Sequence, residues 1–154
     1  MRIIVSACLL GENCKYSGGN NLCPALMEML KRPAPDGTAW EPVPVCPECL
    51  GGLPVPRKPA EIVSGEVRRS DGQSVDAAFR LGAKKALSIA RQSGARLAVL
   101  KAYSPSCGSG EIYDGTFTHR RITGDGVFAA LLKEDGFSVT TEDRLDTVFG
   151  GSLG

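Results

Sequence analysis

The sequence predicts one α/β domain in which a mostly parallel sheet lies between layers of helices, a Rossmann-like three-layer arrangement. Two observations favour this class. The chain has 154 residues, a length that fits a single domain with a full hydrophobic core. Short apolar runs of strand length recur along it, and segments with helical periodicity separate them. Ligands of such folds bind beyond the carboxyl ends of the strands.

The first part of the chain is predicted to contain two strands and one helix. Residues 2–6 are a short β-branched run, typical of a buried strand, and the Gly- and Asn-rich residues 11–21 follow as a loop. Apolar side chains at three- and four-residue steps predict a helix over residues 22–30, ended by the prolines that follow. Residues 41–45 are the second strand, and its two prolines favour an edge or irregular strand.

The middle of the chain contains the clearest helix. Residues 50–59 carry too many Gly and Pro for a regular element, and residues 62–69 are predicted to form a short hairpin arm. Apolar positions mark one face of residues 74–93, and Gly94 can end that helix. The continuous apolar run within residues 96–102 is typical of a strand covered on both faces.

The last third is predicted to complete the alternation. A Gly-rich loop over residues 108–126 precedes a helix over 127–134 and a strand over 137–140. We therefore expect a single domain over residues 1–145 and a flexible tail over 146–154.

The charge, the first apolar run and the lack of nucleotide-binding motifs argue against a nucleic-acid-binding, a membrane and a nucleotide-binding protein. Eighteen Lys and Arg against seventeen Asp and Glu give a net charge of +1, so no global field attracts nucleic acid or an anionic membrane. The first apolar run is too short for a signal peptide or a spanning helix, which predicts a cytoplasmic protein without a membrane partner. Neither a Walker A motif nor a GxGxxG motif is present.

Six cysteines are the most informative feature of the composition. A reducing compartment argues against structural disulfides and favours metal binding or thiol chemistry. Cys8, Cys46 and Cys107 each follow a predicted strand, and the carboxyl ends of parallel strands meet at one edge of a sheet. We therefore expect these three thiols to share a site. The alternative is that these three cysteines fill the core as small apolar side chains. We expect that packing role for Cys23, and we expect Cys14 to lie at the periphery of the site.

Three adjacent thiolates repel one another, so the cluster of cysteines implies a cation. A structural zinc site would usually have a fourth protein ligand, and a zinc ribbon would need two close cysteine pairs. An iron-sulfur cluster on three cysteines leaves one iron open to substrate or water. The sequence therefore favours an iron-sulfur cluster.

Cys46 and Cys49 form a CxxC pattern, which is weak evidence by itself. A thioredoxin-type pair begins a helix that lowers the thiol pKa, but the Gly- and Pro-rich stretch after Cys49 does not favour a helix, so redox exchange is disfavoured. Glu48 would project close to a metal at Cys46 and can serve as general acid or base; the alternative is a solvated loop carboxylate.

Three further polar residues are candidates for the site. Ser104 and Ser106 precede Cys107, where two hydroxyls can donate hydrogen bonds to a ligand or cap a turn. His119 is the only histidine, and its polar and charged neighbours favour a solvent-facing position.

Three motifs in order carry a family resemblance: SACLLG around Cys8, VCPE around Cys46 with LGGLP and PR after it, and SPSCG around Cys107. Together they resemble the thiouracil desulfidase family over nearly the whole chain. The resemblance implies a 4Fe-4S cluster, labile in air, held by Cys8, Cys46 and Cys107. It also implies Glu48 as the proton-transfer residue and Ser104 as a contact for substrate or the attacking water. Cys49 stands where an apolar residue is usual, so it competes with Cys46 as a candidate ligand.

The leading hypothesis is non-redox removal of sulfur from a thiolated pyrimidine such as thiouracil, with the open iron taking the sulfur. A small free base as substrate suits the near-neutral charge and the lack of an extended nucleic-acid surface. Two alternatives remain: a non-catalytic iron-sulfur or zinc module that senses or stores metal or sulfur, and a thiol-disulfide enzyme that works without metal. The sequence predicts no particular oligomeric state.

Overall fold

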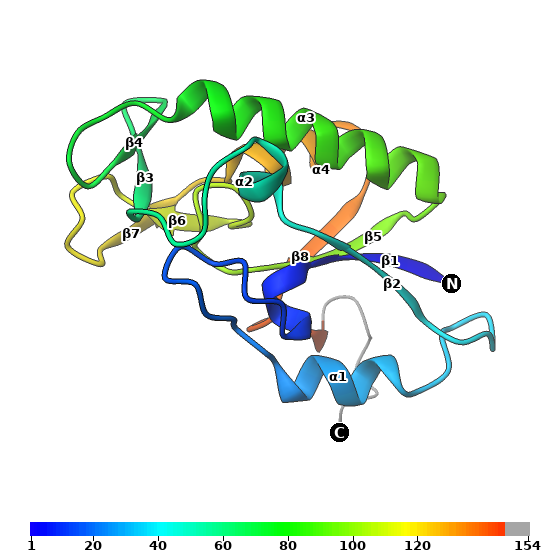
Figure 1. The fold of residues 1–154 in the computed structure, drawn as a ribbon. Coiled ribbons are helices and arrows are strands. Elements are labelled where there is room, and N and C mark those ends of the chain that lie inside the picture. Colours follow the sequence, from blue (N-terminus) through cyan, green and yellow to red (C-terminus); the bar gives the residue numbers. More distant parts are fainter. Residues whose placement is uncertain (147–154) are drawn as a thin grey trace.

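A four-stranded parallel sheet forms the centre of the computed structural model, which describes residues 1–146 (Figure 1). The strand order is β2-β1-β5-β8, and every neighbouring pair runs parallel. The strands are β1 (Arg2–Ser6), β2 (Glu41–Val45), β5 (Leu97–Leu100) and β8 (Ser138–Thr141). The expected fold class is confirmed. Strand β2 lies at the edge of the sheet, as its prolines predict, because proline has no backbone N–H to donate to a neighbouring strand.

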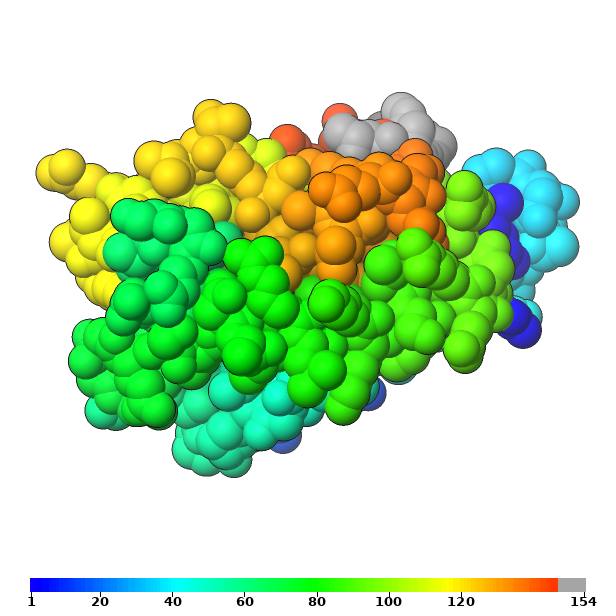
Figure 2. All heavy atoms as spheres, turned by 90° about the horizontal axis from the view of Figure 1, so that it is seen from above, coloured from blue at the N-terminus to red at the C-terminus, as the bar shows by residue number. Residues whose placement is uncertain are grey.

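Helices cover both faces of this sheet. On one face lie α3 (Asp76–Ser93) and α4 (Val127–Glu134), which Figure 2 shows next to each other in green and orange. On the other lie the 3-10 helix η1 (Ala7–Leu10) and α1 (Pro24–Leu30). Successive strand side chains point to opposite faces. Ile4 accordingly packs in the α3/α4 core, while Ile3 and Val5 pack in the core beside α1.

The predicted hairpin arm is present as β3 (Ala60–Val63) and β4 (Glu66–Arg69). A second hairpin, β6 (Glu111–Tyr113) and β7 (Arg121–Thr123), lies inside the segment expected to be loop, so that part of the prediction is wrong. Its strands have three residues each, too few for an alternating pattern to stand out. The expected tail lies outside the described residues apart from Asp146.

A short helix, α2 (Pro47–Leu50), follows β2, and the expectation that no helix forms there is also wrong. Pro47 at the first helical position supplies a helical φ, and Cys46 is the N-cap residue. The Gly-rich residues that argued against a helix instead allow α2 to pack closely on α3. A Cβ at Gly82 would lie 1.7 Å from the Pro47 carbonyl oxygen, and one at Gly51 would lie 2.0 Å from the Ala78 carbonyl oxygen.

Gly82→Ala is expected to lower the free energy of unfolding by about 1–3 kcal/mol, the usual cost of overpacking. The added methyl must push α2 away from α3, because the atom it meets is backbone. Urea unfolding measures the effect, with Lys84→Ala on the exposed face of the same helix as the matched control. Equal midpoints for the two variants would contradict the close α2–α3 packing.

None of the helices within residues 1–146 is long and apolar enough to cross a membrane.

Candidate functional site

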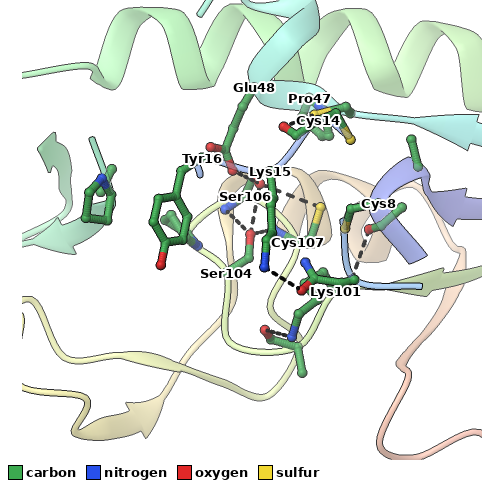
Figure 3. Close-up of a pocket in the computed structure, with 18 of the residues that line it drawn as sticks. Cys8, Cys14, Lys15, Tyr16, Pro47, Glu48, Lys101, Ser104, Ser106 and Cys107 are labelled. Carbon is green, nitrogen blue, oxygen red and sulfur yellow. Dashed lines mark hydrogen bonds between the residues drawn. The ribbon is translucent and has the colours of Figure 1, made fainter. Parts of the chain in front are cut away.

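A cavity of about 310 Å³ opens at the carboxyl edge of the sheet (Figure 3). Cys8, Cys46 and Cys107 all line it, although they are far apart in the sequence. They reach it because β1, β2 and β5 are parallel neighbours, so the segments that leave their carboxyl ends converge. Cys14, which was expected to be peripheral, lines the same cavity.

Local hydrogen bonds fix the backbone that carries two of these thiols. Cys8 lies in η1, and its carbonyl accepts the Asn21 N–H at 2.9 Å, which folds the long first loop back over the site. Cys107 lies in a turn that Ser104 caps: the Ser104 Oγ accepts the N–H of Ser106 at 3.1 Å and of Cys107 at 2.9 Å. Both cysteines are buried.

The two thiols of the CxxC pattern differ in their surroundings. Cys46 lines the cavity, whereas Cys49 does not. Both Sγ atoms lie 3.8 Å from one acceptor, the carbonyl oxygen of Cys14. Burial, reinforced by the nearby Cys46, raises the pKa of the Cys49 thiol to about 11. Of the two candidate ligands in this pattern, Cys46 is therefore the one that faces the site.

The thiols of the cavity are electrostatically coupled. Burial raises the pKa of Cys107 to about 12, and the Glu48 carboxylate and Cys8 add to the rise. The pKa of Cys8 is raised first by burial and further by Cys46, and that of Cys14 by burial and then by Cys46. Deprotonating several of these sulfurs together therefore requires a positively charged partner in the cavity.

The positions of the thiol groups indicate which kind of metal centre fits the cavity. Among residues 1–146, no three His, Cys, Asp or Glu side chains converge closely enough to hold one metal ion. A zinc ion would need its four ligands around a single point. The thiolates that hold an iron-sulfur cluster instead bind different irons, so they stand farther apart. Three soft thiolate donors spread around one cavity therefore fit a cluster better than a single ion.

Glu48 enters the cavity from α2 and is held on both oxygens. Its Oε1 accepts a hydrogen bond from Arg57 Nε at 3.0 Å and forms an ion pair with Arg57 Nη2 at 3.0 Å, and its Oε2 accepts a hydrogen bond from the Ser106 hydroxyl at 2.8 Å. The side chains of Arg57 and Glu48 are only 8% and 17% exposed. Glu48 is thus a fixed, mostly buried carboxylate, and the solvated alternative does not apply.

The two serines before Cys107 form a hydrogen-bonded chain to Glu48. Ser104 Oγ and Ser106 Oγ are 2.9 Å apart. Because a hydroxyl has one proton and Ser106 donates its proton to Glu48, the Ser104 hydroxyl is the donor between the serines. Figure 3 shows this chain below Glu48, with Cys107 beside it. The capped-turn interpretation of Ser104 is confirmed, and Ser106 is the residue that contacts Glu48.

Several residues of the cavity were not singled out from the sequence. Arg57 stands in the PR motif, which was the one available signal for it. Tyr113 comes from the unpredicted hairpin, and Lys101, which is paired with Glu142 at 2.8 Å, follows β5. His119 is exposed, as expected, yet it also lines the cavity, with its ring edge-on to Tyr113 at 6.0 Å between centroids.

Comparisons with known proteins agree with one another. The model of the family described as 2-thiouracil desulfurase matches residues 3–144. The uncharacterized protein YbbK of Bacillus subtilis (strain 168) is 40% identical over 156 residues, which cover 95% of this chain and 99% of that protein. A solved structure described as the [4Fe-4S]-dependent thiouracil desulfidase TudS superposes with a TM-score of 0.84 at 40% identity, covering 99% of both chains.

Proposed function

Because the chain belongs to the 2-thiouracil desulfurase family, we propose that it is an enzyme that removes sulfur from 2-thiouracil or a closely related free thiolated pyrimidine, without net redox change. The observation that carries the proposal is the cavity itself: three thiols from three strand ends face the same space as a fixed carboxylate, Glu48. A storage or sensing module has no need of such a carboxylate.

Cys8, Cys46 and Cys107 are the residues that would hold a 4Fe-4S cluster, the cofactor that the description of TudS names for that protein. When bound, such a cluster supplies a Lewis-acidic iron without a protein ligand. All six cysteines lie in the described part of the chain and are free thiols. We propose a reducing compartment such as the cytoplasm, where thiols that serve as metal ligands persist.

The chemistry assigned to the protein's own residues is proton transfer. The reaction exchanges the C=S bond for a C=O bond: water provides the oxygen, and both of its protons end on the released sulfide, so no electrons are gained or lost. Glu48 takes a proton from the attacking water and returns it to the sulfur. Ser106 keeps the Oε2 atom oriented toward the cavity, and Ser104 supports Ser106 from the turn.

The test is anaerobic reconstitution of the full chain with iron and sulfide, followed by addition of 2-thiouracil. We expect about four irons per chain, loss of the thiocarbonyl absorbance, and one sulfide released for each uracil formed. A chain that binds zinc, or that binds iron and leaves thiouracil unchanged, would overturn the proposal and favour the metal- or sulfur-storage alternative.

The rings of Tyr113 and His119 give the cavity an aromatic wall that suits a planar base. His119→Ala is expected to raise the KM for 2-thiouracil by about 2- to 10-fold, since an aromatic contact contributes about 0.5–1.5 kcal/mol. Steady-state kinetics measure it, and His119→Phe, which keeps a ring, should stay near the wild-type KM. A fall in kcat at unchanged KM would show instead that His119 takes part in the chemistry.

A further inference from the structure

Arg57 is a buried cation that the proposed chemistry does not use. Its side chain is 8% exposed although it comes from a Gly- and Pro-rich loop. Burying a guanidinium is costly unless its donors are satisfied. Here they bind Glu48 Oε1, the Cys14 carbonyl oxygen at 2.9 Å and the Pro54 carbonyl oxygen at 3.2 Å.

The contact with Glu48 distinguishes the two oxygens of the carboxylate. Two nitrogens of the planar guanidinium reach Oε1, so that Oε2 is left for Ser106. A lysine carries a single nitrogen, so it could not contact Oε1 with two donors while also holding the Cys14 and Pro54 carbonyl oxygens. Glu48 lies in a helix of one turn and has several rotatable bonds, so without this contact its carboxylate would sample other rotamers.

No other cation among the described contacts performs this task. Lys58 is the next residue, but its Nζ pairs with Asp71 at 3.3 Å, on the β3–β4 side of the loop. The backbone N–H of Arg57 donates to the Tyr16 carbonyl at 2.7 Å, which anchors the loop from which the guanidinium extends. Arg57 is therefore held at both its backbone and its side chain.

A rival role has to be separated from this one. Arg57 shares the Cys14 carbonyl oxygen with the thiols of Cys46 and Cys49. It could therefore serve to hold the loops that carry the thiols, and its loss would then disturb cluster binding rather than Glu48. The two roles predict different results for iron content and for the coupling with Glu48.

We propose that Arg57 is the positioning residue for Glu48, setting the carboxylate so that Oε2 faces Ser106 and the cavity. The inference rests on the proposed function only for its kinetic consequence, because the placement of Glu48 can be observed without turnover. Arg57 lines the cavity, but its donors are already used by Glu48, Cys14 and Pro54, so it acts on the reaction through Glu48.

The structural test compares crystal structures of the cluster-free wild type and Arg57→Gln. We expect the contact between Glu48 Oε2 and Ser106 Oγ, 2.8 Å in the wild type, to be lost in the variant. An unchanged contact would overturn the inference. This readout remains valid if the wild type does not desulfurise thiouracil, an outcome that overturns the proposed function alone.

The kinetic test uses reconstituted Arg57→Gln, Arg57→Lys, Glu48→Gln and the Arg57→Gln/Glu48→Gln double variant. A misplaced group can cost about 10²-fold in rate, so we expect kcat of Arg57→Gln to fall to that extent with iron content and KM unchanged, and Arg57→Lys to recover only part. The double variant should be no slower than Glu48→Gln, because Arg57 acts through Glu48. The control is Arg80→Gln, which loses an exposed pair with Asp76 and a hydrogen bond to the Gly65 carbonyl, none of which lines the cavity.

Two results would overturn the inference while leaving the proposed function intact. Loss of iron in Arg57→Gln would assign the residue to holding the thiol-bearing loops. Additive effects in the double variant would mean that Arg57 acts independently of Glu48.

Discussion

Replacing Cys8, Cys46 or Cys107 by alanine is expected to abolish iron binding and desulfuration together. Each change removes one of the three thiols that strand ends bring to the cavity, and a cluster with two protein ligands is not retained. Iron should fall from about four per chain to below about one, and turnover to below about 1% of wild type, since the Lewis acid is lost. Iron and sulfide analysis beside a turnover assay measures both, and far-UV circular dichroism should show an unchanged fold.

The remaining cysteines provide matched controls. Cys23 packs half-buried beside α1 and does not line the cavity, so Cys23→Ala should keep its iron. Cys49→Ala should keep it as well, because Cys46 is the cavity-facing thiol of the pair. The ligand set would need revision if Cys49→Ala lost its iron while Cys46→Ala retained it.

Glu48→Gln is expected to reduce kcat by about 10²- to 10⁴-fold, the range that a general acid or base contributes. Glutamine keeps the shape of the side chain and can still accept from Ser106, but it cannot take a proton from water. Iron content should match the wild type, because no thiol is changed. Kinetics and iron analysis of the same anaerobic sample measure the two quantities. A variant with wild-type kcat would rule out Glu48 as the proton-transfer residue.

Glu48→Gln can also destabilise the fold, so a second variant is needed to separate the loss of activity from the loss of stability. The change leaves the buried Arg57 without its ionic partner, and breaking a buried pair can destabilise a protein by about 3–5 kcal/mol. Ser106→Ala avoids this loss because the Arg57–Glu48 pair remains. Its kcat should fall by about 10- to 100-fold, since a hydrogen bond to a charged group contributes about 1.5–3 kcal/mol. If only Glu48→Gln lost activity, and lost its fold as well, the kinetic assignment would fail.

The sheet and its order of elements could be predicted because they depend on local patterns. Strand β1 is a β-branched run, α3 shows helical periodicity that ends at Gly94, and β2 carries the prolines of an edge strand. These features need no knowledge of distant contacts. The prediction that Cys8, Cys46 and Cys107 meet followed from the same patterns, because parallel strands bring their carboxyl ends to one edge.

Other elements depend on contacts between segments that are distant in the sequence. Helix α2 is only one turn long and packs where Gly51 and Gly82 let two backbones touch, which no local propensity reveals. The turn between β6 and β7 is held by Glu61, whose Oε1 accepts the N–H of Gly115 at 2.9 Å and of Phe117 at 3.2 Å. Both contacts span more than fifty residues.

The sequence by itself determined the class of fold, the three thiols at strand ends and the carboxylate beside them. Only the tertiary structure decided how that carboxylate is held, that Ser106 rather than Ser104 contacts it, and which cysteine of the CxxC pattern faces the cavity. The physical reason is that strand ends converge through backbone geometry alone. The orientation of Glu48 depends instead on Arg57 and Ser106, side chains that aperiodic loops bring together only when the whole chain has folded.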